Sequence, residues 1–149
     1  SVSAVPVRGL VVDASCVAKS SVKVTDGYFH GKVEWQCRCI ESGITIFKSP
    51  VRPYGTINIA EYLAIVDALS LLFQNGMHDV PVYSDSITAI TWVNRRLTAS
   101  KLKRNADTVP LLVLMEKAQV WLQNNKPLNP VLKWDTEMWG ENPADYGRK

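Results

Sequence analysis

The order of its segments constrains the fold of this chain more than any other feature. Three β-rich segments come first, at Val7–Ala14, Lys32–Ile40 and Gly43–Lys48, and helical patterns appear only after Pro50 and Pro53. A short turn separates the second segment from the third, so these two are expected to form a hairpin. The first part of the chain therefore predicts an antiparallel meander of three strands.

The rest of the chain alternates between helical and strand-like segments. Such alternation needs crossover connections, and crossovers produce parallel strand pairs. We therefore expect an α/β fold with a mixed sheet of five strands and helices on both faces. The expected elements are helices at Ile59–Gln74, Ile87–Arg96 and Val109–Asn124, strands at Val80–Tyr83 and Val131–Trp134, and the start of a helix at Asn142–Lys149.

Composition narrows the class of protein. The chain has 149 residues, of which 46% are hydrophobic and 21% are charged, so a disordered or collagen-like chain is excluded. This length predicts a single domain over residues 1–149, with residues 1–6 as a loose N-terminal extension. No apolar run approaches a membrane span, and no signal peptide is recognised. The three cysteines, an odd number, form no disulfide framework, so we expect a cytoplasmic protein with no membrane partner.

Four carboxylates stand at the ends of the expected elements. Asp13 ends the first strand, Glu61 lies in the first turn of the long helix, Asp85 ends the fourth strand, and Asp145 opens the terminal segment. If the first and fourth strands are parallel neighbours, Asp13 and Asp85 are adjacent at the edge where open α/β sheets bind ligands. Glu61 shares a helix face with apolar residues further along, so it is expected to point toward the sheet.

Each carboxylate also has a purely structural explanation. Asn58 and Asn142 each precede a carboxylate by three residues, which is the spacing of a helix cap and its capping-box partner. Asp85 could cap the helix that follows it, and Asp13 could be a turn residue. Taken together, however, such a cluster would repel itself and attract cations. Oxygen ligands suit Mg²⁺ or Mn²⁺ rather than zinc, and a pair of such ions can promote phosphodiester cleavage.

Four motifs make the sequence resemble type 1 ribonuclease H over nearly its whole length. They are VVDAS at the first strand, GTINIAEYLAIVDAL at the first helix, VYSDSITA after the fourth strand, and WGENPADYGRK at the end. The EWQ of the second strand and the ending make a bacterial branch of that family especially similar. The resemblance implies a ribonuclease H-like fold with the strand order 3-2-1-4-5.

The resemblance also implies an activity and a metal site. It implies an endoribonuclease that hydrolyses the RNA strand of RNA–DNA hybrids with two Mg²⁺ ions, with Mn²⁺ as a possible substitute. The metal ligands that it implies are Asp13, Glu61, Asp85 and Asp145. Many family members carry a histidine in the loop before the last aspartate. Here Glu141 lies in that loop, and we expect it to assist proton transfer as a further catalytic residue.

A basic segment is the candidate for holding the hybrid. Arg95–Arg104 carries five basic residues and no acidic residue, so the other 139 residues contain 12 basic and 14 acidic groups. A solvated helix end would explain it, but the family places a phosphate-binding edge here. The expected nucleic-acid-binding residues are Ser15, Cys16, Thr56, Asn58, Ser86, Arg95, Arg96, Lys101, Lys103, Arg104 and Arg148.

Two departures from the family leave other functions open. The loop after Asp13 is longer than usual, and the loop before Asp145 contains no histidine. A second hypothesis is therefore a catalytically silent nucleic-acid-binding module on the same fold. A third is a related metal-dependent nuclease that acts on DNA. In each case we expect a monomer without an organic cofactor.

Overall fold

The computed structural model describes residues 4–17 and 31–147. The elements within these residues are β1 (Leu10–Val17), β2 (Gly31–Cys39), β3 (Thr45–Lys48), β4 (Arg52–Gly55), α1 (Ile57–Gln74), β5 (Val82–Ser84), α2 (Ile87–Arg95), α3 (Val109–Asn125), β6 (Val131–Lys133) and α4 (Thr136–Trp139). Arg148 and residues 1–3 of the expected N-terminal extension lie outside the described part. The extension at residues 4–6 has no regular secondary structure.

The strands form one mixed sheet in the order β3-β2-β1-β5-β6. Strand β1 pairs antiparallel with β2 and parallel with β5, and β5 pairs parallel with β6. The expected order 3-2-1-4-5 is confirmed, since the fourth and fifth expected strands are β5 and β6. The expected hairpin of β2 and β3 is also confirmed by their antiparallel pairing.

The sheet has six strands rather than the expected five. Pro50 and Pro53 were expected to interrupt the chain, but β4 forms across Pro53 and pairs with β2 alone. Strand β2 is nine residues long, so one half of it pairs with β3 and the other half with β4. Proline is tolerated in β4 because an edge strand does not need every N–H for the ladder.

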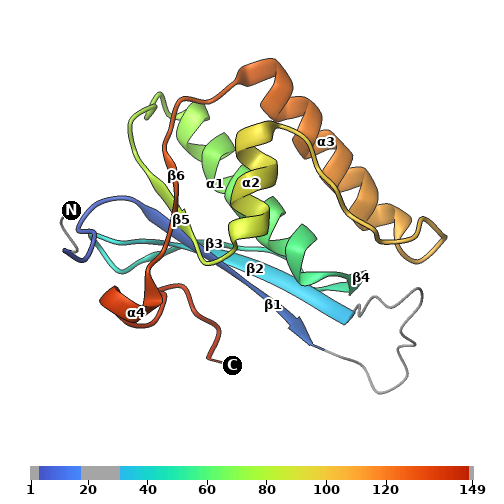
Figure 1. Ribbon diagram of the computed structural model, residues 1–149, viewed down its shortest axis with the longest axis horizontal. Coiled ribbons are helices and arrows are strands. Elements are labelled where there is room, and N and C mark those ends of the chain that lie inside the picture. Colours follow the sequence, from blue (N-terminus) through green and yellow to red (C-terminus); the bar gives the residue numbers. More distant parts are fainter. Residues whose placement is uncertain (1–3, 18–30, 148–149) are drawn as a thin grey trace.

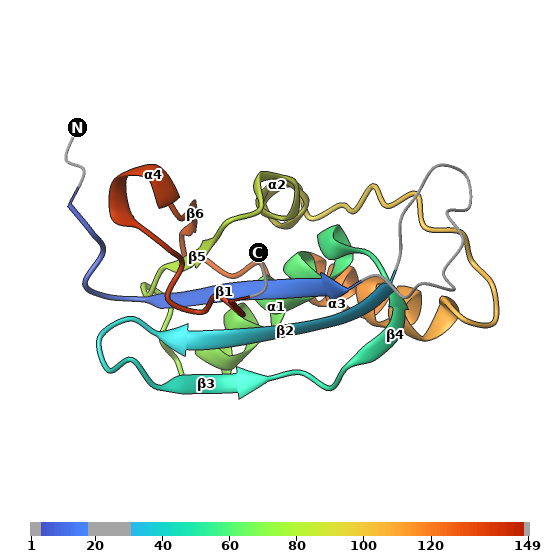
Figure 2. The same cartoon turned by 90° about the horizontal axis from the view of Figure 1, so that it is seen from below.

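The helices are distributed unequally over the two faces of the sheet. Helices α1, α2 and α3 cover one face, and the short α4 lies on the other (Figure 1). Strand β1 is buried on both sides, because Val12 packs in the main core with α1, whereas Val11 packs with Tyr83 and Trp134 on the α4 side. Figure 2 shows β1, β2 and β3 side by side along the sheet. Helices on both faces were expected, and this is confirmed.

Helix α1 is the central helix of the main core. It is long and apolar enough to cross a membrane by length and composition, with a mean hydropathy of 1.4, so the expectation that no run approaches such a length is wrong. However, 61% of that segment is buried within the protein. Because a core helix surrounded by sheet and helices is apolar on most sides, burial explains this composition.

The end of the chain differs from the expectation of a terminal helix. Up to Gly147 the residues after Asn142 form turns, and the last helix is instead α4, where the Asp135 side chain caps Met138 N. Gln36 Nε2 donates a hydrogen bond to Ala144 O. In a helix this carbonyl oxygen would instead accept from the backbone amide one turn later. A side chain of the sheet therefore takes the place of helical bonding here.

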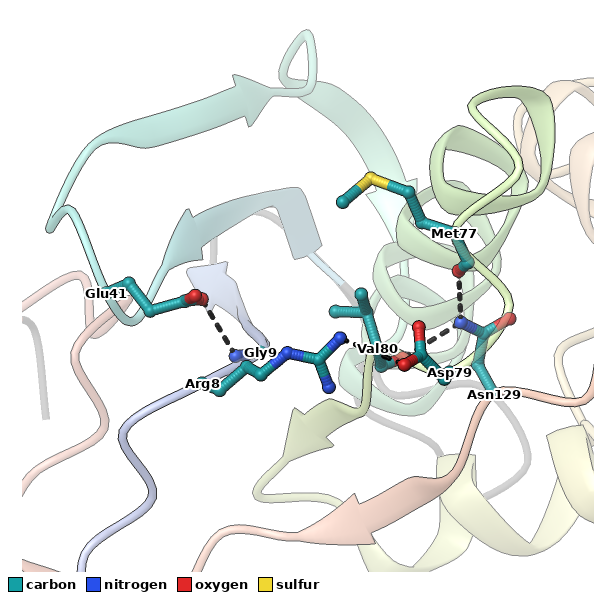
Figure 3. Close-up of polar contacts among 7 residues, drawn as sticks. All are labelled: Arg8, Gly9, Glu41, Met77, Asp79, Val80 and Asn129. Carbon is teal, nitrogen blue, oxygen red and sulfur yellow. Dashed lines mark hydrogen bonds and ion pairs between the residues drawn. The ribbon is translucent and has the colours of Figure 1, made fainter.

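Loop contacts fix the ends of the sheet strands (Figure 3). Asn129 Nδ2 donates to Met77 O at 2.8 Å and to Val80 O at 2.9 Å, which ties the approach to β6 to the approach to β5. On the neighbouring strand, Gly9 N donates to Glu41 at 3.2 Å. Because buried polar groups are costly without partners, Asn129 orders this part of the fold.

Close packing at the end of β4 makes Gly55 sensitive to substitution. A Cβ atom there would lie 2.5 Å from Leu111 Cδ2 and 2.8 Å from Val33 Cγ2. We expect Gly55→Ala to lower the free energy of unfolding by about 1–3 kcal/mol through overpacking, measured by urea denaturation. The cost should shrink in a Leu111→Ala background, where the nearest atom is gone. Strictly additive effects in this double-mutant cycle would contradict the steric explanation.

Candidate active site

The pairing of β1 with β5 runs toward two of the four carboxylates. The parallel register joins Leu10 to Val82 and Val11 to Tyr83. The ladder ends at this pair, and Asp13 and Asp85 each come two residues later in their segments, Asp85 directly after β5. The position of Asp13 differs from the expectation, because β1 continues to Val17 and Asp13 lies in the middle of the strand. Asp13 is only 1% exposed, which removes the turn explanation.

Glu61 reaches the same region from helix α1. The helix starts at Ile57 with Thr56 as its cap, since Thr56 Oγ1 accepts a hydrogen bond from Ile59 N at 3.3 Å. Glu61 therefore lies in the second turn, not the first, and Asn58 is not the cap. Glu61 is 6% exposed, so the expectation that it points inward is confirmed. Its inward position is not explained by helix capping.

Asp145 is held in a turn built on β2. Its amide donates to Asn142 O at 2.9 Å, and its Oδ2 accepts from Gly147 N at 3.0 Å. The adjoining Ala144 is fully buried and is bound by Gln36, the residue of β2 that pairs with Asp13. The turn that carries Asp145 therefore lies against the strand pair that carries Asp13. Glu141, one residue before Asn142, is exposed.

Asp85 is bound by two side chains that sequence reasoning did not assign to the site. Asn142 Nδ2 donates to its Oδ2 at 2.9 Å, and Thr136 Oγ1 donates to its Oδ1 at 3.3 Å. Asp85 does not cap α2, because Ser86 does so by accepting from Ala89 N at 3.0 Å. The only signal for Asn142 in the sequence was its spacing from Asp145, which suggested a helix cap.

A cleft of about 710 Å³ lies near these carboxylates, although none of the four is among its lining residues. Its walls come from the end of β1, the start of α1, helix α2 and the loop after α2. Ala14 and Tyr146, the chain neighbours of Asp13 and Asp145, both line it. Five of the expected nucleic-acid-binding residues line it as well: Ser15, Cys16, Thr56, Asn58 and Lys101. The cleft thus brings chain neighbours of two carboxylates together with residues expected to bind a substrate.

The remaining expected binding residues are not gathered in this cleft. Arg95 and Lys103 are exposed, and Arg96 is the left-handed cap that ends α2. Arg104 forms an exposed ion pair with Glu116. The basic segment Arg95–Arg104 therefore forms an exposed margin of the cleft. Of its five basic residues, Lys101 alone lines the cleft itself.

The chemistry of the donor set fits an oxygen-ligated divalent cation. The expected ligands are all carboxylates, which suit Mg²⁺ or Mn²⁺. In the part of the chain that the structure describes, however, no group of three or more Asp, Glu, His or Cys side chains is arranged to hold an ion. Asp13 and Asp85 each lie two residues beyond the last pair of the β1–β5 ladder, so both belong to the same end of the sheet.

Comparison with known proteins identifies the family. A family model described as reverse transcriptase-like matches residues 33–121, which is more than half of the chain and includes Glu61 and Asp85. The structure of LC11 ribonuclease H1, isolated from compost by a metagenomic approach, is similar at 17% identity and a TM-score of 0.52, covering 87% of this chain and 86% of that one.

A viral structure has a similar fold. Prototype foamy virus protease-reverse transcriptase matches at 11% identity and a TM-score of 0.51, covering 85% of this chain and 17% of that one. The resemblance to the bacterial branch stays a prediction. The strand order, the helices on the two faces and the family match agree with one another, and the chain belongs to the reverse transcriptase-like family and has a ribonuclease H-like fold.

Proposed function

We propose that this protein is a metal-dependent endoribonuclease that cleaves the RNA strand of RNA–DNA hybrids. The observation that carries the proposal is the β1–β5 pairing, which ends two residues before both Asp13 and Asp85, near a cleft of about 710 Å³ that Ala14 and Tyr146 line. The similar structure from compost is named a ribonuclease H1, which supports this choice of substrate. The proposal includes Mg²⁺ as the natural ion and Mn²⁺ as a substitute.

In this proposal the four carboxylates would share the task of holding the divalent ions. Asp13 and Asp85 would supply ligands from the sheet, Glu61 would supply one from α1, and Asp145 would supply one from the C-terminal turn. The bound ions would supply activation of water and stabilisation of the leaving oxygen. Glu141, exposed beside the turn, would exchange a proton between the site and solvent.

The cleft would hold the hybrid by its backbone. Thr56 and Asn58 stand at the start of α1, where unpaired backbone amides favour a phosphate. Small polar groups that line the cleft, such as Ser15 two residues after Asp13, would contact a 2′-hydroxyl, the group that distinguishes RNA from DNA. Lys101 and the exposed basic margin would add salt-dependent, sequence-independent affinity.

A silent binding module is the second candidate, and one observation favours it. Both carboxylate oxygens of Asp85 accept hydrogen bonds, from Asn142 and Thr136, and the described residues hold no ready group of three ligands. Incubation with labelled hybrid, RNA duplex and DNA duplex, each in Mg²⁺ and in Mn²⁺, separates the candidates. Hybrid binding without cleavage in either ion supports the module, and cleavage of DNA alone would support the DNA nuclease.

Substitution of Asp85 tests the catalytic role directly. Asp85→Asn keeps the shape of the side chain but removes its charge, so we expect hybrid cleavage to slow by about 100-fold or more. Asp79→Asn is the matched control, because Asp79 is exposed, forms an ion pair with Arg8 at 3.2 Å (Figure 3), and does not line the cleft. Equal cleavage rates for the two variants in a steady-state assay would exclude the proposed mechanism.

Salt dependence tests the basic margin. The double variant Lys101→Ala/Lys103→Ala should raise KM for the hybrid and lower the slope of log KM against log salt by about 2, roughly one per lost phosphate contact. Its matched control is Lys48→Ala/Lys117→Ala, two lysines that line a different hollow between β3 and α3. If both double variants change the slope equally, the margin has no special part in binding.

Thiol labelling tests the position of the substrate. Cys16 lines the cleft and is half-buried, and burial raises its pKa. Alkylation of Cys16 should therefore be slow, should accelerate as the pH rises, and should slow further when a non-cleavable hybrid is bound. Mass spectrometry of peptides from the labelled protein measures each cysteine separately.

The other two cysteines serve as internal controls for this labelling. Cys37 is fully buried, and burial raises its pKa to about 12, so it should react only after unfolding. Cys39 is half-buried at the C-terminal end of β2, whereas Cys16 of β1 pairs with Val33 near the other end of β2. Cys39 therefore lies away from the cleft. A hybrid that protects Cys39 as much as Cys16 would indicate that the nucleic acid lies elsewhere.

A further inference from the structure

The Asn142 side chain joins three segments that are distant in the sequence. It is 3% exposed, and its Nδ2 donates to Val12 O at 3.0 Å and to Asp85 Oδ2 at 2.9 Å. Its Oδ1 accepts from Ala144 N at 2.7 Å. One amide thus contacts the central strand, the residue after β5 and the turn that carries Asp145.

The contact with β1 replaces a missing sheet bond. The last β1–β5 pair is Val11 with Tyr83, so Val12 lies just beyond the paired part of the ladder. Its carbonyl, immediately before Asp13, accepts from Asn142 instead. Because a buried carbonyl without a partner is costly, this bond fixes the chain next to Asp13.

We propose that Asn142 is a positioning residue that sets Asp85 and the Asp145 turn relative to Asp13. The inference deepens the proposed function and rests on it only for the effect on catalysis. Thr136 cannot substitute for Asn142, because its hydrogen bond to Asp85 is longer, at 3.3 Å, and exposed. Gln36 holds Ala144 from β2 but does not reach Asp85.

The chemistry of the side chain limits what can replace it. Only an amide offers two N–H donors together with a carbonyl acceptor in this small volume. An aspartate would keep the shape but place a charged oxygen against Val12 O and Asp85 Oδ2. Alanine would remove all three bonds and leave the buried Val12 O without this partner. Asn142→Asp is therefore expected to harm the site at least as much as Asn142→Ala.

The test compares Asn142→Ala with Asn129→Ala. Asn129 is a suitable control because it is also buried and its Nδ2 also donates two hydrogen bonds, in this case to the carbonyls of Met77 and Val80, before β5 begins (Figure 3). Both variants should lose stability, which urea denaturation measures. Assays are run at a temperature where both are fully folded, so that global unfolding does not lower the rates.

The first readout needs neither metal nor activity. Hydrogen exchange of the Ala144 and Asp145 amides, followed by NMR in metal-free protein, reports the order of the turn directly. In Asn142→Ala these amides should exchange about 10-fold faster than in Asn129→Ala, once the difference in global stability is taken into account. Equal protection in the two variants would overturn the inference, whether or not the protein proves to be a nuclease.

The second readout compares the effect of each substitution on kcat with its effect on KM. Asn142→Ala should lower kcat for hybrid cleavage by about 10- to 100-fold and leave KM within about twofold, because the reacting groups are misplaced while the cleft is intact. Asn129→Ala should change neither parameter by more than about twofold. If the parent chain does not cleave hybrid, the proposed function fails and the exchange measurement alone decides the role of Asn142.

Discussion

The rest of the structure depends on the burial of strand β1 on both of its faces. Val11 and Val12 are fully buried on opposite sides, and Asp13 follows them at 1% exposure. A carboxylate is costly in such a position unless hydrogen bonds or a cation compensate it. Strand β2 fixes one neighbour through its register, which sets Gln36 opposite Asp13, and on the other side the β1–β5 ladder ends two residues before Asp13. The site is therefore a consequence of how the central strand is packed.

The C-terminal turn is stabilised by buried amides where the sequence suggested a helix. Gln36 and Asn142 hold the segment through Ala144, which is itself fully buried. Trp134 and Trp139 add an aromatic cluster beneath it, with ring centroids 5.1 Å apart. A turn bound by side chains from the sheet can present Asp145 at a defined place without the cooperative bonding of a helix. It also makes the site sensitive to single polar side chains.

The sequence predicted the features that depend on patterns over many residues, such as strand order and helix faces. It did not predict local geometry, such as strand ends and hydrogen bonds between distant side chains. The strand order follows from hydrophobic runs and crossover rules, and the inward direction of Glu61 follows from helix periodicity. The position of Asp13 was misplaced because polar Ser15 looked like a strand end, although β1 continues through it. Strand β4 was missed because Pro53 argues against a central strand but not against an edge. The role of Asn142 depends on contacts with Val12 and Asp85, 130 and 57 residues away, which no local pattern reveals.

Helix α1 explains why a carboxylate site can form in so apolar a setting. The helix is buried along most of its length, and its composition would suit a membrane. Glu61 stands near its start at 6% exposure. One turn earlier on the helix, the exposed Asn58 lines the cleft. The Glu61 carboxylate keeps a fixed direction because the helix that carries it is packed. The same burial that orders α1 would therefore also hold Glu61 in place to bind a cation.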